Sequence, residues 1–97
     1  MKFSWDPRKA DSNLRKHGIA FDEAITVFND PLALIFDDMI HSDDEDREII
    51  IGFSPLRRLI LVCFVERDKD TIRIISARRA TKAEVRDYEK NAQRKAS

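Results

Sequence analysis

Two adjacent arginines close to the end of an alternating apolar segment, Arg78 and Arg79, are well suited to chemistry. A guanidinium group stays charged at any working pH, and its planar N–H donors match two oxygens of a phosphate. Arginine can therefore hold a phosphate and stabilise the charge that develops on it during cleavage. Lys16 and His17 form a second pair, expected at the C-terminal end of a helix, where the helix dipole favours a protonated imidazole. His17 is accordingly either a general acid or a C-cap that donates to the last carbonyls of its helix.

Other common kinds of catalytic site have no counterpart in the sequence. The single cysteine, Cys63, lies in an apolar run, which indicates a packing role in a reducing compartment. His17, His41 and Cys63 are not at metal-ligand spacing, and neither a Gly-rich phosphate loop nor a Ser/His/Asp pattern is present. We therefore expect no metal site and no cofactor.

The length and the charge of the chain narrow the possible classes further. Ninety-seven residues suffice for one modest core, so we expect a single domain over residues 1–97. The 18 basic and 18 acidic residues cancel, which argues against a general polyanion binder. The charge is nevertheless uneven, because residues 37–48 hold seven acids and one base, whereas residues 49–79 hold seven bases and three acids. No apolar run approaches the roughly 20 residues of a membrane span, and no secretory signal is present, so we expect a cytoplasmic protein without membrane contact.

Proline and glycine mark the first two elements that must position these residues. Asp6-Pro7 predicts an N-cap followed by proline at the first helical position, and Gly18 predicts a left-handed stop. Residues 7–17 are therefore expected to form a helix. Apolar side chains at helical spacing over residues 21–28 predict a second, short helix, which ends before Pro31.

Strand-like segments and one more helix follow. After a short extended start at residues 2–5, the runs rich in β-branched and aromatic residues are 32–36, 47–53, 59–66 and 71–77. Their hairpin spacing predicts an antiparallel meander. Thr81 and Glu84 form a capping box, which predicts a C-terminal helix. The narrow apolar face of this helix, which comprises Ala83, Val85, Tyr88 and Ala92, either packs on the sheet or contributes to a partner interface.

The predicted order is β-α-α-β-β-β-β-α, an α+β fold with an antiparallel sheet. The helices are expected to cover one face of the sheet and leave the other partly open for a site. Side chains alternate between the two faces along a strand. With unbroken alternation, Ile72, Ile74 and Ser76 face the helices, Arg73, Ile75, Ala77 and Arg79 lie on the open face, and Arg78 leans toward the covered side or its edge.

Several short motifs along most of the chain together resemble the BrnT family of toxins. They are Trp5-Asp6-Pro7-x-Lys9, Asn13-x-x-Lys16-His17-Gly18, Phe21-x-x-Ala24, Phe28-x-Asp30-Pro31, His41-Ser42 with Glu45-x-Arg47, Gly52, and the segment from Ile72 to Thr81 with Glu84 and Tyr88. The resemblance implies a RelE-like fold and a ribonuclease that arrests translation. It also implies a ribbon-helix-helix antitoxin that neutralises the toxin in a hetero-oligomer and contacts operator DNA.

Residues that fall on these motifs are the candidates for the site. The predicted catalytic residues are Lys16, His17, Glu45, Arg47, Arg78 and Arg79, and the predicted RNA-binding residues on the motifs are Lys9 and Arg73. Arg58 and Lys82, which lie outside the motifs, are also predicted to bind RNA. Glu45 and Arg47 have an alternative interpretation, because alternate residues at the start of a strand can form an ion pair at its rim.

The resulting hypothesis is a metal-independent endoribonuclease. Such chemistry needs a base for the 2′-hydroxyl, positive charge on the phosphate and an acid for the leaving 5′ oxygen. His17 is the candidate acid, and Glu45 or Lys16 is the candidate base. The alternatives are a non-catalytic module that binds protein or nucleic acid, and a degenerate toxin that retains only the antitoxin interface.

Overall fold

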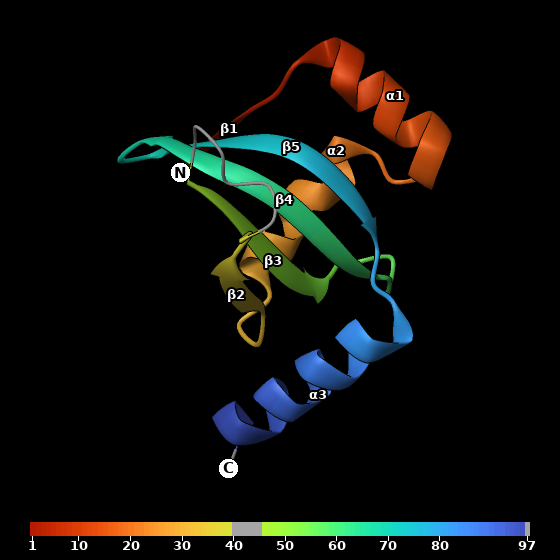
Figure 1. Ribbon diagram of the computed structural model, residues 1–97, viewed down its shortest axis with the longest axis vertical. Helices are drawn as coiled ribbons and strands as arrows, with labels where there is room; N and C mark the ends of the chain where they lie inside the picture. The colour runs from red at the N-terminus through yellow and green to blue at the C-terminus, as the bar shows by residue number, and fades with distance from the viewer. Residues whose placement is uncertain (40–45, 97) are drawn as a thin grey trace.

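A five-stranded sheet with helices on both of its faces forms the described part of the chain, residues 1–39 and 46–96 of a computed structural model (Figure 1). The elements in chain order are β1 (Lys2–Ser4), α1 (Pro7–His17), α2 (Phe21–Ala24), the 3₁₀ helix η1 (Ile25–Asn29), β2 (Leu34–Asp37), β3 (Arg47–Phe53), β4 (Leu59–Asp68), β5 (Thr71–Arg79) and α3 (Lys82–Ala96). The predicted α+β class is confirmed.

The sheet is mixed rather than wholly antiparallel. Its strand order is β1-β5-β4-β3-β2, and β2 to β5 form the predicted antiparallel meander. β1 instead lies parallel to β5, with Ser4 opposite Arg73. The expectation of an antiparallel sheet was therefore wrong for β1. Its three residues carry no alternation signal, and the residues with which it pairs lie in the last third of the sequence.

Helix α1 has the bounds that its flanking residues predict. The Asp6 carboxylate accepts a hydrogen bond from the Arg8 N–H at 2.9 Å, and proline occupies the first turn. Gly18 adopts φ 69° and donates its N–H to the Leu14 carbonyl at 2.9 Å. A left-handed residue at this point is unstrained only for glycine, so the helix ends there.

The second predicted helix begins as α2 and continues as the 3₁₀ turn η1, which runs against β3. Asp30 ends this segment, and its carboxylate accepts hydrogen bonds from the Leu32 N–H and the Phe53 N–H, each at 2.9 Å. Gly52 of β3 permits this close approach, because a Cβ atom there would lie 3.1 Å from the Val27 carbonyl oxygen. The hydrogen bonds of Asp30 and the absence of a Cβ atom at Gly52 thus allow η1 to pack closely on the sheet.

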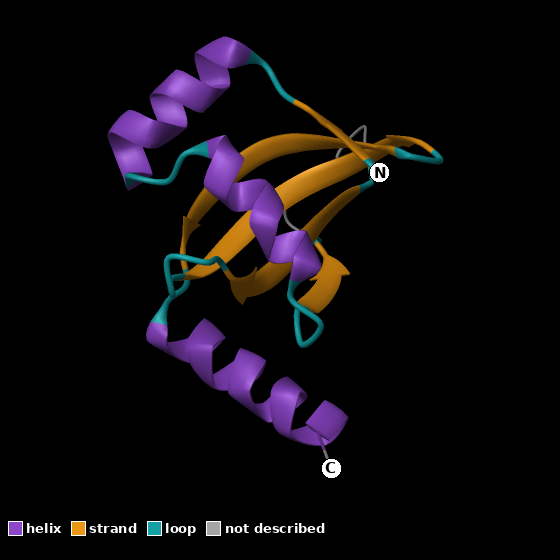
Figure 2. Ribbon diagram, turned by 180° about the vertical axis from the view of Figure 1, so that it is seen from behind, coloured by secondary structure: helices purple, strands orange, loops and turns teal. Residues whose placement is uncertain are grey.

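One face of the sheet is closed by α1, α2 and η1, as Figure 2 shows. We call this the covered face. Its core consists of apolar side chains that are nearly inaccessible to solvent: Ile19, Phe21, Ala24, Val27 and Ala33 from the helical side and its connections, and Ile50, Ile60, Val62, Phe64, Ile72, Ile74 and Ala77 from the strands. Burial of this apolar surface is the main stabilising contribution to the fold.

Among the described residues, α3 is the element that covers part of the opposite face, the open face, and it does so at one end (Figures 1 and 2). Tyr88 of α3 is buried against Ile51 and Leu61, and its ring meets that of Phe53 edge to face at 5.4 Å. Its hydroxyl donates to the Asp30 carboxylate at 2.7 Å. Tyr88 therefore packs on the domain's own sheet, which is the first of the two roles that the sequence left open.

A β-bulge in β5 changes which face its last residues occupy. Cys63 of β4 pairs with Ser76, whereas the next residue, Phe64, pairs with Ile74, so Ile75 is an extra residue in β5. A single inserted residue reverses the alternation beyond it. Ser76 and Arg78 consequently lie on the open face, while Ala77 is buried in the covered core with Arg79 following on that side.

The predicted orientations are therefore correct for Ile72 and Ile74 but wrong from Ser76 onward. Unbroken alternation assumes one residue per register position, and a bulge violates that assumption. It follows that Arg78, and not Arg79, is the arginine that reaches the open face.

Candidate active site

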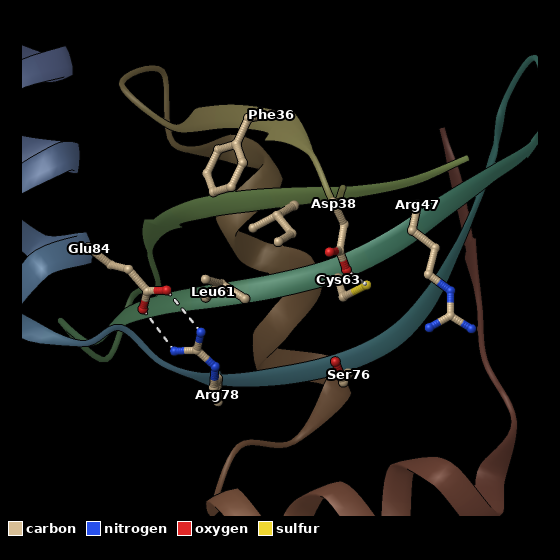
Figure 3. Close-up of a pocket in the computed structure, with 9 residues that line it drawn as sticks. Phe36, Asp38, Arg47, Leu61, Cys63, Ser76, Arg78 and Glu84 are labelled. Atoms are coloured by element: carbon tan, nitrogen blue, oxygen red, sulfur yellow. Dashed lines mark hydrogen bonds and ion pairs between the residues drawn. The ribbon is translucent and has the colours of Figure 1, made fainter. Parts of the chain in front are cut away.

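A hollow of about 370 Å³ lies on the open face, beside the first turn of α3 (Figure 3). It is lined by Phe36, Asp38, Arg47, Ile49, Leu61, Cys63, Ser76, Arg78 and Glu84. Apolar side chains from β3 and β4 lie at its centre, and charged groups surround them. We call it the open-face hollow.

Arg78 is held in place by the first turn of α3. Its Nη1 and Nη2 atoms donate to the two Glu84 carboxylate oxygens at 2.8 and 2.9 Å, and Nη1 also contacts the Arg79 carbonyl at 3.2 Å. Glu84 in turn accepts from the Thr81 N–H at 2.7 Å, which completes the predicted capping box. The Arg78 guanidinium holds the pKa of the Glu84 carboxyl below its usual value. The helix cap and the arginine thus share one carboxylate.

Arg47 lines the hollow on the side remote from Arg78 (Figure 3). It lies opposite Val65 in the sheet, and Val65 lies opposite Arg73. Directly paired residues share a face, so Arg47 and Arg73 flank Val65 on the open face. Two of the predicted arginines therefore occupy one row of the sheet, and Arg78 lies further along the same face.

A second, smaller hollow of about 180 Å³ lies between α1 and β5. We call it the α1 groove. It is lined by Lys9, Ser12, Asn13, Lys16, His17, Ile75 and Ser76. Ser76 lines both hollows, so the bulged segment of β5 is their common wall. The fold therefore brings the Lys16–His17 pair next to the arginine-bearing open face.

His17 is exposed at the C-terminal end of α1, and the Gly18 N–H closes the last turn. Among the described residues, no hydrogen bond or ion pair involves the His17 side chain. The C-cap interpretation is therefore not the arrangement seen here, and the imidazole is free to meet a ligand in the α1 groove.

Asn13 fixes α1 to β5 and is a residue whose role the sequence did not reveal. Its amide nitrogen donates to the carbonyls of Ile19 and Ala77 at 2.9 and 2.8 Å, and its amide oxygen accepts from the Ala77 N–H at 3.0 Å. The side chain thus replaces a neighbouring strand where β1 has ended. The sequence feature that could have indicated this role is an asparagine on the inner side of a helix that is otherwise rich in charged residues.

Arg58 and Arg79 lie on the other side of the sheet. Arg58 forms a two-pronged ion pair with Glu23 of α2, in which its Nε donates to the carboxylate at 2.9 Å and its Nη2 meets the other oxygen. The Ser54 hydroxyl also donates to Glu23 at 2.7 Å. The Arg58 hydrogen bonds lower the pKa of Glu23, and Arg79 adds a smaller attraction. Neither arginine lines the open-face hollow.

Two other predicted residues lie apart from both hollows. Lys82 is exposed at the start of α3 and lines neither of them. Glu45 lies outside the described residues, so its predicted role as base stays a prediction.

Cys63 forms part of the floor of the open-face hollow. The side chain is buried, and its thiol lies 3.7 Å from an Asp38 carboxylate oxygen. Burial, with the nearby Asp38 charge, raises the pKa of the thiol to about 11. The thiol is therefore neutral at physiological pH and donates to Asp38, which agrees with the predicted packing role rather than with a reactive thiolate.

No cluster of three or more histidine, cysteine, aspartate or glutamate side chains placed to hold a metal ion occurs within residues 1–39 and 46–96. Over the same residues, no helix has the length and apolar character needed to cross a bilayer.

A comparison with known families assigns the chain to a class of toxins. The model of the family described as "Ribonuclease toxin, BrnT, of type II toxin-antitoxin system" matches residues 5–84. The chain therefore belongs to the BrnT family of ribonuclease toxins, and the predicted resemblance is confirmed.

A solved structure supports this assignment. The structure is similar to the 1.1 Å crystal structure of the Brucella abortus ribonuclease toxin BrnT, with a TM-score of 0.65 and 26% sequence identity. The match covers 84% of this chain and 99% of the Brucella chain. None of the curated proteins compared matches this chain.

Proposed function

We propose that this chain is a metal-independent endoribonuclease of RelE-like fold, which arrests translation by cleaving RNA. The observation that carries the proposal is the common wall at Ser76, which sets Lys16 and His17 beside the arginines of the open face. Membership of a family of ribonuclease toxins supports RNA as the substrate.

The chemistry that these residues support is attack of a 2′-oxygen on the adjacent phosphorus. A base takes the proton of the 2′-hydroxyl, and the bond from phosphorus to the 5′ oxygen breaks as a 2′,3′-cyclic phosphate forms. His17 donates a proton to the departing 5′ oxygen. Glu45 or Lys16 is the candidate base.

Positive charge on the two sides of Ser76 stabilises the phosphate as its charge increases. Lys9 and Lys16 supply this charge from α1, and Arg47 and Arg78 supply it from the sheet. Arg73, in the row of Arg47, extends the basic track along the open face. Arg58 and Lys82 contribute only to the general field of the surface.

Regulation follows the pattern of type II toxin–antitoxin systems. We propose a cytoplasmic toxin held inactive by a ribbon-helix-helix antitoxin in a hetero-oligomer, with operator DNA contacted through the antitoxin. The outer side of α3 carries alternating acidic and basic residues and is the proposed contribution of this chain to that interface. Removal of residues 89–97 should then weaken antitoxin binding.

Replacement of the proposed acid tests the function. Purified protein should cleave a single-stranded RNA in excess chelator and leave 2′,3′-cyclic phosphate and 5′-hydroxyl ends. His17→Ala should lower the rate by about 10²- to 10⁴-fold and remove the alkaline limb of the pH–rate profile. Circular dichroism should show an unchanged fold, since His17 is exposed. Cleavage by the variant at the rate of the original protein would contradict the proposal.

A further inference from the structure

The open-face hollow has a largely apolar floor, bordered by the buried Asp38 carboxylate, and an aromatic rim. Leu61 and Cys63 are 6% and 7% exposed and form the floor, where the thiol is neutral. Phe36 of the edge strand β2 is 41% exposed, and its ring lies at the rim on the side of Glu84 (Figure 3). The volume of about 370 Å³ falls in the usual range of small-molecule sites, roughly 300–1,000 Å³. A flat, largely apolar group fits such a surface.

The rim also offers a fixed pair of hydrogen-bond donors. A guanidinium group has two edges that can bind two oxygens each, one formed by Nη1 and Nη2 and the other by Nε and Nη2. Glu84 takes the first edge of Arg78. Within the part of the chain that the structure describes, no acceptor contacts the Arg78 Nε. Glu84 therefore fixes the guanidinium while its second edge is available to a phosphate.

The position of the hollow relates these two features to RNA. It shares Ser76 with the α1 groove, so a strand whose cleaved phosphate lies at His17 extends onto the open face. A nucleotide combines a flat base with an anionic phosphate, which is the combination that the floor and the Arg78 edge complement. Single-stranded RNA is commonly held by stacking of its bases on aromatic side chains.

We propose that the open-face hollow is a nucleotide subsite of the enzyme, in which one unpaired RNA base stacks on Phe36 above Leu61 and Cys63, and the reacting phosphate next to this base binds the Nε–Nη2 edge of Arg78. The inference rests on the proposed function, because that function supplies RNA as the ligand. It adds a base-binding role for Phe36 and a positioning role for Glu84.

The subsite is tested by whether removal of the Phe36 ring and removal of one RNA base abolish the same binding interaction. The probe is an eight-nucleotide single-stranded RNA with 2′-fluoro sugars, which lacks the 2′-hydroxyl nucleophile and stays intact while binding is measured by fluorescence anisotropy. An abasic sugar is placed at each position in turn. One position should lose about fivefold or more in affinity, the usual size of a base–aromatic stack.

Three variants then distinguish Phe36 from its surroundings. Phe36→Ala should weaken binding of the intact probe by a similar factor. The variant should bind the probe with the abasic sugar at the critical position as tightly as the unaltered protein binds that same probe. Phe36→Trp should retain the affinity. Ile35→Ala is the matched control, because Ile35 is also exposed on β2 but pairs with Ile50 on the covered face, and it should bind as the unaltered protein does.

Several results would overturn the subsite. They are unchanged RNA binding by Phe36→Ala, an equal loss for intact and abasic probes, or no binding of the probe at all. Weaker antitoxin binding with unchanged RNA binding would make the hollow a protein interface instead. Failure of the protein to cleave natural RNA, with the coupling to Phe36 intact, would refute the proposed catalysis and leave the subsite standing.

Discussion

Two arginine–glutamate pairs at the same end of the sheet have different consequences because they lie on opposite faces. Arg58 and Glu23 lie on the covered side, with side chains 25% and 9% exposed, whereas Arg78 and Glu84 border the open face at 40% and 21%. Glu23 binds the Nε–Nη2 edge of its arginine and also accepts from the Ser54 hydroxyl. Glu84 binds the Nη1–Nη2 edge.

The difference between the edges explains the difference in role. At Glu23 the carboxylate and the arginine connect α2 to the turn before β4, and Arg58 Nη2 also reaches the Gly18 carbonyl at 3.4 Å. At Glu84 the same kind of pair leaves an edge of the guanidinium toward the open-face hollow. An arginine–glutamate ion pair can therefore either connect two elements of the fold or orient the arginine for a ligand. Which of the two it does depends on the edge of the guanidinium that the carboxylate binds.

Within this comparison of the two faces, the largest expected effect concerns the two adjacent arginines of β5. Arg78→Ala should lower RNA cleavage by about 10²- to 10³-fold, since one preorganised donor to the reacting phosphate is lost. Arg78→Lys should not restore it, because an ammonium cannot contact two oxygens in one plane. Arg79→Ala should lower the rate by about fivefold or less, the size of an exposed electrostatic contact. Rates of purified variants with matching circular dichroism spectra measure the difference, and a larger loss for Arg79→Ala would contradict the role assigned to the bulge.

The covered pair should affect stability rather than activity. Glu23→Gln should lower the free energy of unfolding by about 1.5–3 kcal/mol, because a hydrogen-bonded charge is replaced by an amide. Urea unfolding followed by circular dichroism measures this change. Cleavage by the folded variant should match that of the original protein, and a loss of activity without a loss of stability would place Glu23 in the site.

The same pair gives a pH dependence with a defined sign. The pKa of Glu23 is lowered in the folded state, so the pair stabilises the protein above the ordinary value of 4.5, and that stabilisation disappears as the pH falls through the lowered pKa. Glu23→Gln should remove this part of the loss of stability in acid. An unchanged difference in stability between pH 7 and pH 3 would show that the pair does not contribute.

The smallest expected effect separates the two roles of Glu84. Glu84→Gln should lower cleavage by about threefold to fivefold, since the partly exposed pair that orients Arg78 is weakened. Its matched control is Thr81→Ala, which removes the hydroxyl of the capping box and leaves the Arg78 contact. This control should lower the free energy of unfolding by about 1 kcal/mol without a change in cleavage. Equal effects of both variants on cleavage would mean that only the helix start matters.

Features set by neighbouring residues could be predicted from the sequence. Asp6-Pro7 and Gly18 determine the ends of α1, and β3 has the predicted bounds of residues 47–53. The pairs Lys16–His17 and Arg78–Arg79 were recognised as candidates because they combine suitable chemistry with family motifs. Each of these signals is local, since a cap, a stop or a motif depends on residues close in the chain.

Features that depend on pairing between distant segments could not be predicted. The bulge at Ile75 arises from the register of β5 against β4, and it decides which arginine reaches the hollow. The ion pair between Glu23 and Arg58 joins residues 35 positions apart. Two of the three hydrogen bonds of Asn13 reach the backbone of Ala77 in β5, 64 positions away. No periodicity within a single segment carries this information.

The contact between Asn13 and Ala77 also bears on how the protein meets other chains. β1 pairs with β5 at residues 71–73, and the Asn13 amide occupies both backbone hydrogen-bonding groups of Ala77. The edge of β5 between them is too short to recruit a foreign strand, and edges left unpaired are where sheets aggregate or exchange strands. A side chain in α1 thus protects the sheet beside the proposed catalytic groove, at a point of β5 that β1 does not reach.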